Sequence, residues 1–439
     1  MKHPFVFALL GGVLFLTGCR DTQPNPAPGN YQDAFLPEMD GLFNEFQKLQ
    51  DLGSYEVLGD TLMSANKDLQ ASELYVQAAF AYWEAGDADA AAAMLHRAID
   101  RGMSNPKVLE KFPESQQEPT GASWDQLKKR LDSIQAQLQK PSNFDLKTAS
   151  MEAFWPYFEK AMADTSQARR HLKAFIFEAP REVRDFYVVR YGSIDNMYGQ
   201  MINAAPNYYR YLKTRFHPDS LKVFRKTILK SMKQFQELYP QAVFPKVYIV
   251  PGILNTGGTA TEMGMFLGGD MYGRSPQMPV EDLTDWQEDA IMEFAELPRL
   301  TMHELMHFQQ NYRDTTHGQT LLSAVIQEGV CDFMVELCSG NPMVNENLTF
   351  LSDPSNEAWI FGEFQEELLG DDTSKWLYNG GSIEDRPQDL GYTLGYLICK
   401  SYYEQSPDKK EAIAELLNTD DFMKIVKNSD FAYLLKEAI

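Results

Sequence analysis

The sequence predicts a mainly helical α+β fold, in which a helical N-terminal region precedes a domain with a small sheet and a buried central helix. Residues 36–140 are rich in alanine and lack the alternating pattern of strands. Two short apolar runs, 247–250 and 264–268, flank a glycine-rich turn and supply strands before the helical pattern resumes. With 44% hydrophobic residues, a chain of 439 residues can bury the cores of two to three domains.

The first residues are typical of an export signal. Met1-Lys2-His3 is a short positive segment, and the apolar run 4–16 is too short to span a membrane. Leu16-Thr17-Gly18-Cys19 then matches the lipobox of bacterial lipoproteins. Residues 1–18 are therefore predicted to be a lipoprotein signal peptide, and Cys19 the lipidated residue that attaches the mature chain to a membrane.

Two features after Cys19 refine this expectation. Arg20 stands where the inner-membrane retention signal has an acidic residue, which favours an exported lipoprotein of the outer membrane, on either face. Residues 19–35 contain three closely spaced prolines among polar residues and are predicted to be a flexible tether.

Residues 36–140 are predicted to form a helical, tetratricopeptide-like region. The spacing from Tyr75 to Ala98 fits one helical hairpin, with its turn at Glu84-Ala85-Gly86-Asp87. Because one hairpin cannot bury both faces alone, we expect it to pack with helices in 37–70 and 123–138. The region is either a surface for a protein partner or a bundle that supports the second domain.

The second domain is predicted to span 141–439. Helices in 141–245 lead to the strand 247–250, the glycine-rich turn 255–260 and the run 264–268, which we expect to form the edge strand of the small sheet. The glycines lack the Lys-Ser/Thr ending of a phosphate-binding loop, which argues against nucleotide binding.

His303-Glu304-Leu305-Met306-His307 is the strongest chemical signal in the chain. On a helix, the two imidazoles lie one turn apart on one face, as a Zn²⁺ ion requires. Glu304 follows the first of them and is placed to act as a general base toward a water on the metal. Apolar neighbours on more than one face predict a buried helix, and Pro298 marks its start.

A catalytic zinc site needs a third protein ligand, and spacing separates the candidates. A metzincin is excluded because Gln310 and Arg313 occupy the positions of its glycine and third histidine. Glu328 lies at a distance that allows a loop and a second helix, on which Asp332, four residues later, shares its face and can accept a hydrogen bond from His303. The alternatives are less favoured, since His317 lies in a turn and Cys331 fits a small buried hydrophobic residue.

The order HExxH and then ExxxD resembles the gluzincin metallopeptidases, whose zinc is held by two histidines and a glutamate. Within that group the chain is similar to a bacterial family of predicted Zn-dependent proteases related to gliding-motility-associated lipoproteins of Bacteroidetes. The resemblance covers roughly 145–439 and rests on 300–307, 328–333 and 386–396. It implies a zincin-like domain, one Zn²⁺ per chain and a downstream donor for the oxyanion, for which Tyr392 and Arg386 are the candidates.

The predicted function is therefore a lipid-anchored zinc metallopeptidase that hydrolyses peptide or protein substrates with Glu304 as general base. The alternative is a noncatalytic envelope lipoprotein with a structural or vestigial zinc site. The net charge of −22 argues against a nucleic-acid partner.

Overall fold

The computed structural model describes residues 31–112, 120–216, 218–379 and 383–435. The predicted signal peptide, 1–18, and Cys19 lie outside these residues, as do residues 19–30 of the predicted tether. Its last residues lie against the folded body, because Tyr31 stacks on Phe177 with ring centroids 5.1 Å apart. Within the described ranges, no helix has both the length and the apolar character needed to cross a membrane.

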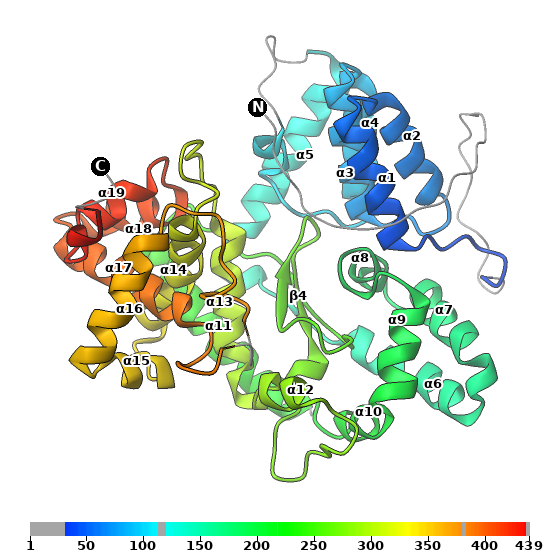
Figure 1. Cartoon of the computed structure of the whole chain (residues 1–439). Coiled ribbons are helices and arrows are strands. Elements are labelled where there is room, and N and C mark those ends of the chain that lie inside the picture. Colours follow the sequence, from blue (N-terminus) through cyan, green and yellow to red (C-terminus); the bar gives the residue numbers. More distant parts are fainter. Residues whose placement is uncertain (1–30, 113–119, 217, 380–382, 436–439) are drawn as a thin grey trace.

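The described part of the N-terminal region is helical, as the sequence predicts. Its helices are α1 (Met39–Asp51), α2 (Tyr55–Ala65), α3 (Ser72–Glu84), α4 (Ala88–Asp100) and α5 (Ala122–Leu138). The predicted hairpin turn is present between α3 and α4, where Gly86 adopts a φ of +81° that favours glycine. Helix α2 packs against α3 of this hairpin, α1 packs against α2, and α5 packs against α4 (Figure 1). The likeness to tetratricopeptide repeats stays a prediction.

A second group of helices lies on one side of the sheet and leads to a long helix that packs against α13 and α14. The group comprises α6 (Ala149–Ala163), α7 (Ala168–Glu178), α8 (Glu182–Phe186), α9 (Ile194–Met197) and α10 (Pro206–Leu212), and the long helix is α11 (Pro218–Leu238). Two π-helical turns, Tyr187–Tyr191 and Tyr198–Ala204, follow α8 and α9. Figure 1 shows α6 to α10 beside the sheet, and α11 packs against the helix that carries the HExxH motif.

The sheet of the described residues is small and mixed, with the order β1-β2-β4-β3. Its strands are β1 (Leu146–Lys147), β2 (Val247–Val250), β3 (Gly258–Ala260) and β4 (Met265–Gly268), of which only the β3–β4 pair is antiparallel. The prediction that 264–268 forms the edge was wrong. The four residues of β4 are all buried between β2 and β3, so their apolar character reflects an interior strand, and β3 forms the edge.

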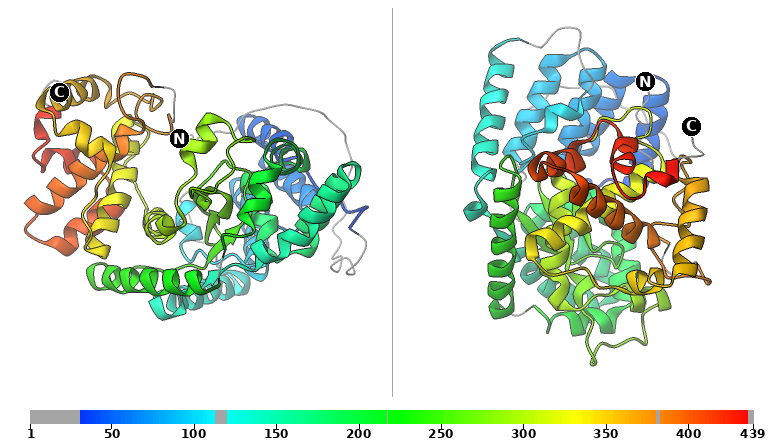
Figure 2. Two further views of the ribbon diagram at one scale, coloured as in Figure 1. Left: turned by 90° about the horizontal axis from the view of Figure 1, so that it is seen from below. Right: turned by 90° about the vertical axis from the view of Figure 1, so that its left-hand side faces the viewer.

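The C-terminal part of the chain forms a helical lobe on the other side of the sheet (Figure 2). Its helices are α13 (Leu297–Gln309), α14 (Leu321–Ser339), α15 (Glu346–Leu351), α16 (Pro354–Glu367), α17 (Leu390–Gln405), α18 (Lys409–Asn418) and α19 (Phe422–Lys427). The short helix α12 (Asp285–Ala290) lies below the sheet, near α10 (Figure 1). Helix α14 is the centre of this lobe, because it packs against α11, α13, α17, α18 and α19. The mainly helical fold with a small sheet is thus confirmed.

Helices α14 and α17 approach each other unusually closely, at Gly329 and Gly395. A Cβ atom on Gly395 would lie 1.9 Å from the carbonyl oxygen of Val325, and one on Gly329 would lie 2.0 Å from the backbone of Gly395. This crossing fixes the position of α17 relative to the side chains on α14.

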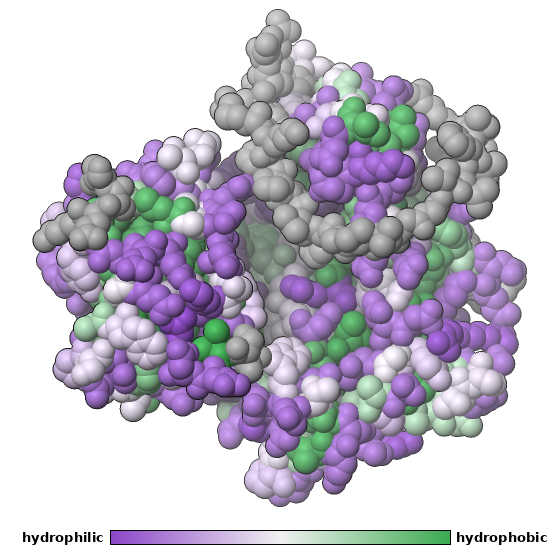
Figure 3. All heavy atoms as spheres, in the orientation of Figure 1, coloured by the Kyte–Doolittle hydropathy of each residue, from purple (hydrophilic) through white to green (hydrophobic). Residues whose placement is uncertain are grey.

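The surface is hollowed between the C-terminal lobe and the rest of the molecule (Figure 3). Helix α13 and the β3–β4 hairpin lie between the two sides of this hollow (Figure 1). His307 of α13 lines a small cavity together with Ala260 at the end of β3.

Candidate metal centre and active site

Helix α13 brings His303 and His307 to one face. It begins at Leu297 with Pro298 in its first turn, as predicted, since proline there costs no backbone hydrogen bond. Because the two histidines are four residues apart, their rings lie one turn apart, with centroids separated by 5.0 Å. The Nε2 atoms of the two rings are 3.2 Å apart and point to a common position.

Helix α14 contributes a third donor at the same position. The Oε2 atom of Glu328 lies 3.2 Å from Nε2 of His303 and 3.2 Å from Nε2 of His307. The three atoms therefore form a nearly equilateral triangle. In a tetrahedral zinc site with bonds of ~2.0–2.1 Å, the ligand atoms lie about 3.3 Å apart, so the triangle fits three ligands of one Zn²⁺ ion.

Each imidazole is oriented by a partner on its other nitrogen. Nδ1 of His303 donates to Oδ1 of Asp332 at 3.0 Å, in the place that the helical spacing predicts. Nδ1 of His307 donates to Oε1 of Gln310 at 3.0 Å, and the amide of Gln310 donates in turn to the carbonyl of Gln327 on α14. These bonds fix the tautomer that leaves both Nε2 atoms free as metal ligands.

The electrostatics of this cluster favour a positive charge at its centre. Burial alone would lower the pKa of both imidazoles, but hydrogen bonds to Asp332 and Glu328 raise the pKa of His303 to about 10. The bond to Glu328 likewise raises the pKa of His307. Burial would raise the pKa of Glu328, and the two imidazoles lower it instead. A bound cation would satisfy the same donor set.

Cys331 lies close to the two histidines, but its sulfur is less well placed than the Glu328 carboxylate to share one metal ion with both of them. Its Sγ atom lies 3.5 Å from Nδ1 and 3.7 Å from Nε2 of His307, beside the ring rather than at the common position. Burial, followed by the nearby carboxylates, raises the pKa of this thiol well above 9.0, and the thiol donates to the carbonyl of Gln327. Although His303, His307 and Cys331 can also be grouped as metal donors, the geometry favours Glu328 as the third ligand.

Glu304 is packed between α13 and the edge strand. A Cβ atom on Gly258 of β3 would lie 2.4 Å from the side chain of Glu304, so only glycine leaves room for this carboxylate. Burial raises the pKa of Glu304, and His307 and His303 oppose that shift. On the same strand, Thr259 accepts a 2.6 Å hydrogen bond from Nε of Arg190. The carboxylate thus lies close to the metal cluster and to the strand that borders the hollow.

Two tyrosines complete the site, and only one of them was predicted. The ring of Tyr392, at the start of α17, lies 6.2 Å from the ring of His303. Tyr378 was missed, yet its hydroxyl donates to Oε1 of Glu328. Desolvation and the nearby Glu328 carboxylate raise the pKa of both phenols, so both remain protonated donors. The Tyr378 residue is nevertheless 71% exposed.

The loop that carries Tyr378 is held by a reciprocal pair of hydrogen bonds. The backbone N–H of Asn379 donates to the side chain of Asp389, and the backbone N–H of Asp389 donates to the side chain of Asn379, each at 2.9 Å. Tyr378 and Asp389 both have positive φ values, 57° and 54°. This left-handed backbone, uncommon for such residues, turns the loop back over Glu328.

Other predicted or alternative residues lie apart from the cluster. Among the described residues, Arg386 pairs with Glu363 at 2.9 Å and lies over the ring of Trp376, so the structure does not bring it to the three metal donors. His317 pairs with Asp314, 3.5 Å away, in the turn after α13.

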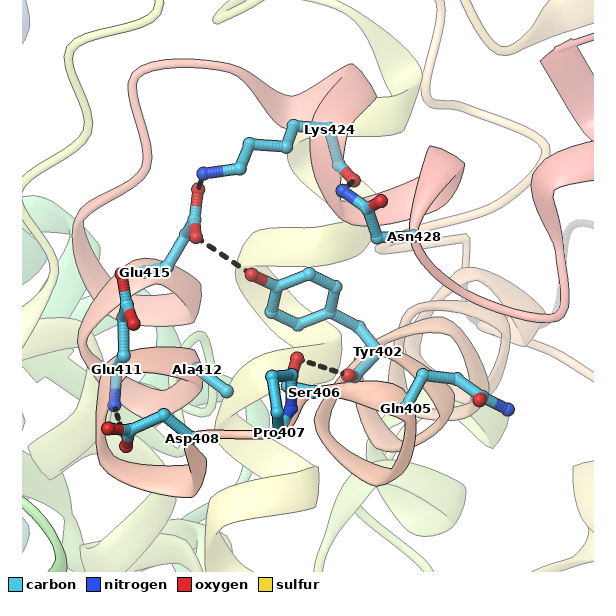
Figure 4. A pocket seen from close by; sticks show the side chains of 10 residues that line it. All are labelled: Tyr402, Gln405, Ser406, Pro407, Asp408, Glu411, Ala412, Glu415, Lys424 and Asn428. Atoms are coloured by element: carbon cyan, nitrogen blue, oxygen red, sulfur yellow. Dashed lines mark hydrogen bonds and ion pairs between the residues drawn. The ribbon is translucent and has the colours of Figure 1, made fainter.

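Two cavities lie in different parts of the molecule, and one of them borders the candidate site. One of about 400 Å³ lies between α17, α18 and α19 (Figure 4), and it includes none of the cluster residues. Its central polar groups are satisfied by each other, since Glu415 accepts from Tyr402 at 2.8 Å and pairs with Lys424. The other, of about 80 Å³, is lined by His307 and by the end of β3. Only the smaller cavity belongs to the candidate active site.

The sequence analysis did not predict Gln310, Gly258 or Tyr378 as site residues. Each of them takes part in the site through a contact with another element of the fold. Gln310 and Gly258 could have been found only if the hairpin and α14 had been placed next to α13. Tyr378 follows a buried tryptophan in a loop, and no local pattern marks it. The only available signal was its position in the loop-rich stretch before α17.

Comparison with known families agrees with this geometry. A family described as a predicted Zn-dependent protease matches residues 282–424. The match contains all three metal donors, Glu304 and both tyrosines, but none of the sheet and none of the N-terminal helices. No curated protein and no solved structure matches the chain.

Proposed function

We propose that this protein is a zinc-dependent peptidase of the gluzincin type. The observation that carries the proposal is the triangle of His303, His307 and Glu328 donor atoms with 3.2 Å sides. The family match supports zinc and proteolysis over the segment that contains this triangle. Glu304, directly after the first histidine, supports catalysis over a purely structural metal site.

Zn²⁺ bound by the three residues would polarise a substrate carbonyl and increase the acidity of a water molecule. Glu304 accepts the proton of the attacking water and later gives it to the leaving amine. Burial raises the pKa of Glu304, and a less acidic carboxyl group holds the proton better between these two steps. Tyr392 and Tyr378, both protonated, are the candidate donors to the oxyanion.

The edge strand supports a peptide as the substrate. β3 is an edge strand of the sheet, and among the described strands it pairs with β4 alone. A free strand edge can bind an extended peptide through backbone hydrogen bonds, while side chains fit pockets on either side. Such binding would lay the scissile bond across α13, next to Glu304.

The test separates metal binding from catalysis. In the purified protein we expect one zinc per chain by elemental analysis and cleavage of a peptide library detected by mass spectrometry. Glu304→Gln should keep zinc and lose at least ~100-fold in cleavage rate. Zinc retention without any cleavage by the native protein would instead support the noncatalytic lipoprotein with a structural site.

Matched variants identify the third ligand. Glu328→Gln should lower zinc content strongly, whereas Cys331→Ser and His317→Ala should leave both zinc and cleavage near native levels. Loss of zinc in Cys331→Ser with retention in Glu328→Gln would assign the metal to the cysteine and contradict the proposed gluzincin set.

We also propose that Cys19 is lipidated and that the protein is an outer-membrane lipoprotein. The lipobox and the residue after it support this placement. Labelling with a fatty-acid analogue should mark the native chain and not Cys19→Ser, and membrane fractionation should place the native chain with the outer membrane. Recovery of both forms in the soluble fraction would contradict it.

A further inference from the structure

The tip of the β3–β4 hairpin is held by the N-terminal helical region, more than 150 residues away in the sequence. The backbone N–H groups of Ser104 and Asn105 donate to the carbonyl of Glu262 at 2.8 and 3.0 Å. The hydroxyl of Ser104 donates to the carbonyl of Met263 at 2.6 Å. The turn that connects the edge strand to β4 is therefore attached to the loop after α4.

Glu262 is the centre of this attachment. Its Oε2 accepts from the Asn105 amide at 2.8 Å, and its Oε1 pairs with Lys111. Its own backbone N–H donates to Oε1 of Glu73, at the start of α3, at 2.7 Å. The residue is only 6% exposed, so these partners replace water around a buried acid, and removal of any of them leaves a polar group unpaired.

The same segment closes one end of the candidate cleft. The 80 Å³ cavity beside the metal cluster has residues of 105–111 on one side, and Ala260, Thr261 and the end of α13 with His307 on the other. At about 80 Å³ this space has room for a chain end or one small side chain.

We propose that residues 104–111 are the end wall of the substrate cleft and that Glu262 is the positioning residue that holds this wall against the edge strand. The proposal rests on the proposed peptidase function and specifies its substrate. A peptide paired with β3 advances ~3.3 Å per residue and meets the wall just beyond Ala260. The substrate is therefore a peptide with one end near the scissile bond, and the N-terminal region sets the position of cleavage.

The experiment uses a nested series of peptides around one cleaved sequence, lengthened at either end. For the native full chain we expect kcat/KM to tolerate extension at one end and to fall ~10-fold when the other end is extended beyond the wall, mainly through KM. Equal tolerance of both extensions would overturn the proposal, and so would cleavage at the middle of long chains.

Substitutions then locate the effect in the wall. Glu262→Ala should reduce the penalty for extension, while Ala260→Leu, at an exposed position that lines the cavity, should increase it even where Glu262→Ala folds poorly. Asp100→Asn is the matched control, because it removes an ion pair of the N-terminal region, with Arg130, that does not touch the hairpin. Equal effects of Asp100→Asn and Glu262→Ala, or no effect of Ala260→Leu, would contradict the wall.

Binding measured without turnover separates this inference from the proposed function. In the Glu304→Gln background, fluorescence anisotropy should show the same ~10-fold preference for the shorter peptides, with zinc content unchanged. If the native protein cleaves no peptide but shows this binding preference, the proposed peptidase function is contradicted and the proposed end wall is supported. If the protein cleaves peptides with no length preference in binding or rate, only the proposed end wall is contradicted.

Discussion

The helix pair α13–α14 and the β3–β4 hairpin face each other across the candidate site, and they are held in place by different means. The helix pair is buried in the C-terminal lobe, and its functional side chains are spaced by the helical repeat. The hairpin edge carries one glycine in contact with Glu304, and its turn is held by polar contacts from the N-terminal region. The proposed metal centre therefore depends on the geometry of two packed helices, whereas the proposed substrate strand depends on residues far away in the chain.

We expect the largest effect from a substitution that disrupts the close contact between helices α14 and α17. Gly395→Ala places a methyl group 1.9 Å from a backbone carbonyl, which cannot move away as a side chain can. We expect a loss of about 3 kcal/mol in the free energy of unfolding. Urea denaturation measures it. Gly362→Ala is the control, since a Cβ there meets nothing within 4 Å, and should leave stability unchanged or slightly higher.

A substitution in the β3–β4 hairpin should lower the rate of catalysis rather than the stability of the protein. Gly258→Ala forces the Glu304 side chain aside, and a flexible side chain can give way without unfolding the protein. We expect kcat/KM to fall about 100-fold, or ~3 kcal/mol in transition-state stabilisation, with zinc retained. Steady-state kinetics and elemental analysis check this. Full activity in Gly258→Ala would show that the contact does not position the carboxylate.

The hydrogen-bond partners of the two histidines, Asp332 and Gln310, should differ in their effect on zinc affinity. Asp332→Ala should weaken zinc binding by roughly 10- to 100-fold, because a charged acceptor orients His303 and increases its basicity. Gln310→Ala should weaken it less, since the amide that His307 contacts is neutral. Titration against a competing chelator gives both constants. A larger effect of Gln310→Ala would reverse the assigned order.

The smallest effect concerns the far end of α14, away from both sides of the site. Glu336 pairs with Lys400 at 2.7 Å and accepts from Tyr396 at 2.6 Å. Burial would raise the pKa of Glu336, but these partners and the N–H of Met343 lower it from 4.5. The stabilisation is therefore present above pH 4.5 and is lost as the pH falls through the lower folded value.

Glu336→Gln should accordingly cost about 1 kcal/mol at pH 7, discounted for partial exposure of the pair. The difference from the native protein should shrink in acid, and denaturation at pH 7 and pH 3 measures it. A difference that is the same at both pH values would mean that packing, not charge, accounts for the effect.

The sequence was sufficient where chemistry follows the helical repeat. His303, Glu304 and His307 form a motif, and the four-residue spacing of Glu328 and Asp332 needs only a helix to bring both to one face. The order of strands could not be derived in the same way, because the apolar residues of β4 suit an edge over a cleft as well as the interior of a sheet. The choice depends on β3, whose sequence has no strand-like pattern.

The remaining residues of the site depend on tertiary contacts. Tyr392 was reached through a family resemblance, and the Gly329–Gly395 crossing explains how α17 brings it beside His303. Tyr378 and Gln310 have no motif, since one lies in an irregular loop and the other follows the motif helix. Arg386 was placed by the same resemblance as Tyr392, and its pairing with Glu363 keeps it elsewhere.

The attachment of Glu262 to the loop after α4 also bears on how such a protein can diversify. All three metal donors lie between residues 303 and 328, but the strand opposite them is supported from Glu73 and from 104–111. Under the proposed function, changes in the N-terminal helices would alter which peptides are accepted without touching the residues proposed to bind zinc. Under the proposed function, metal binding and substrate choice could then evolve separately, because they are encoded in separate parts of the gene.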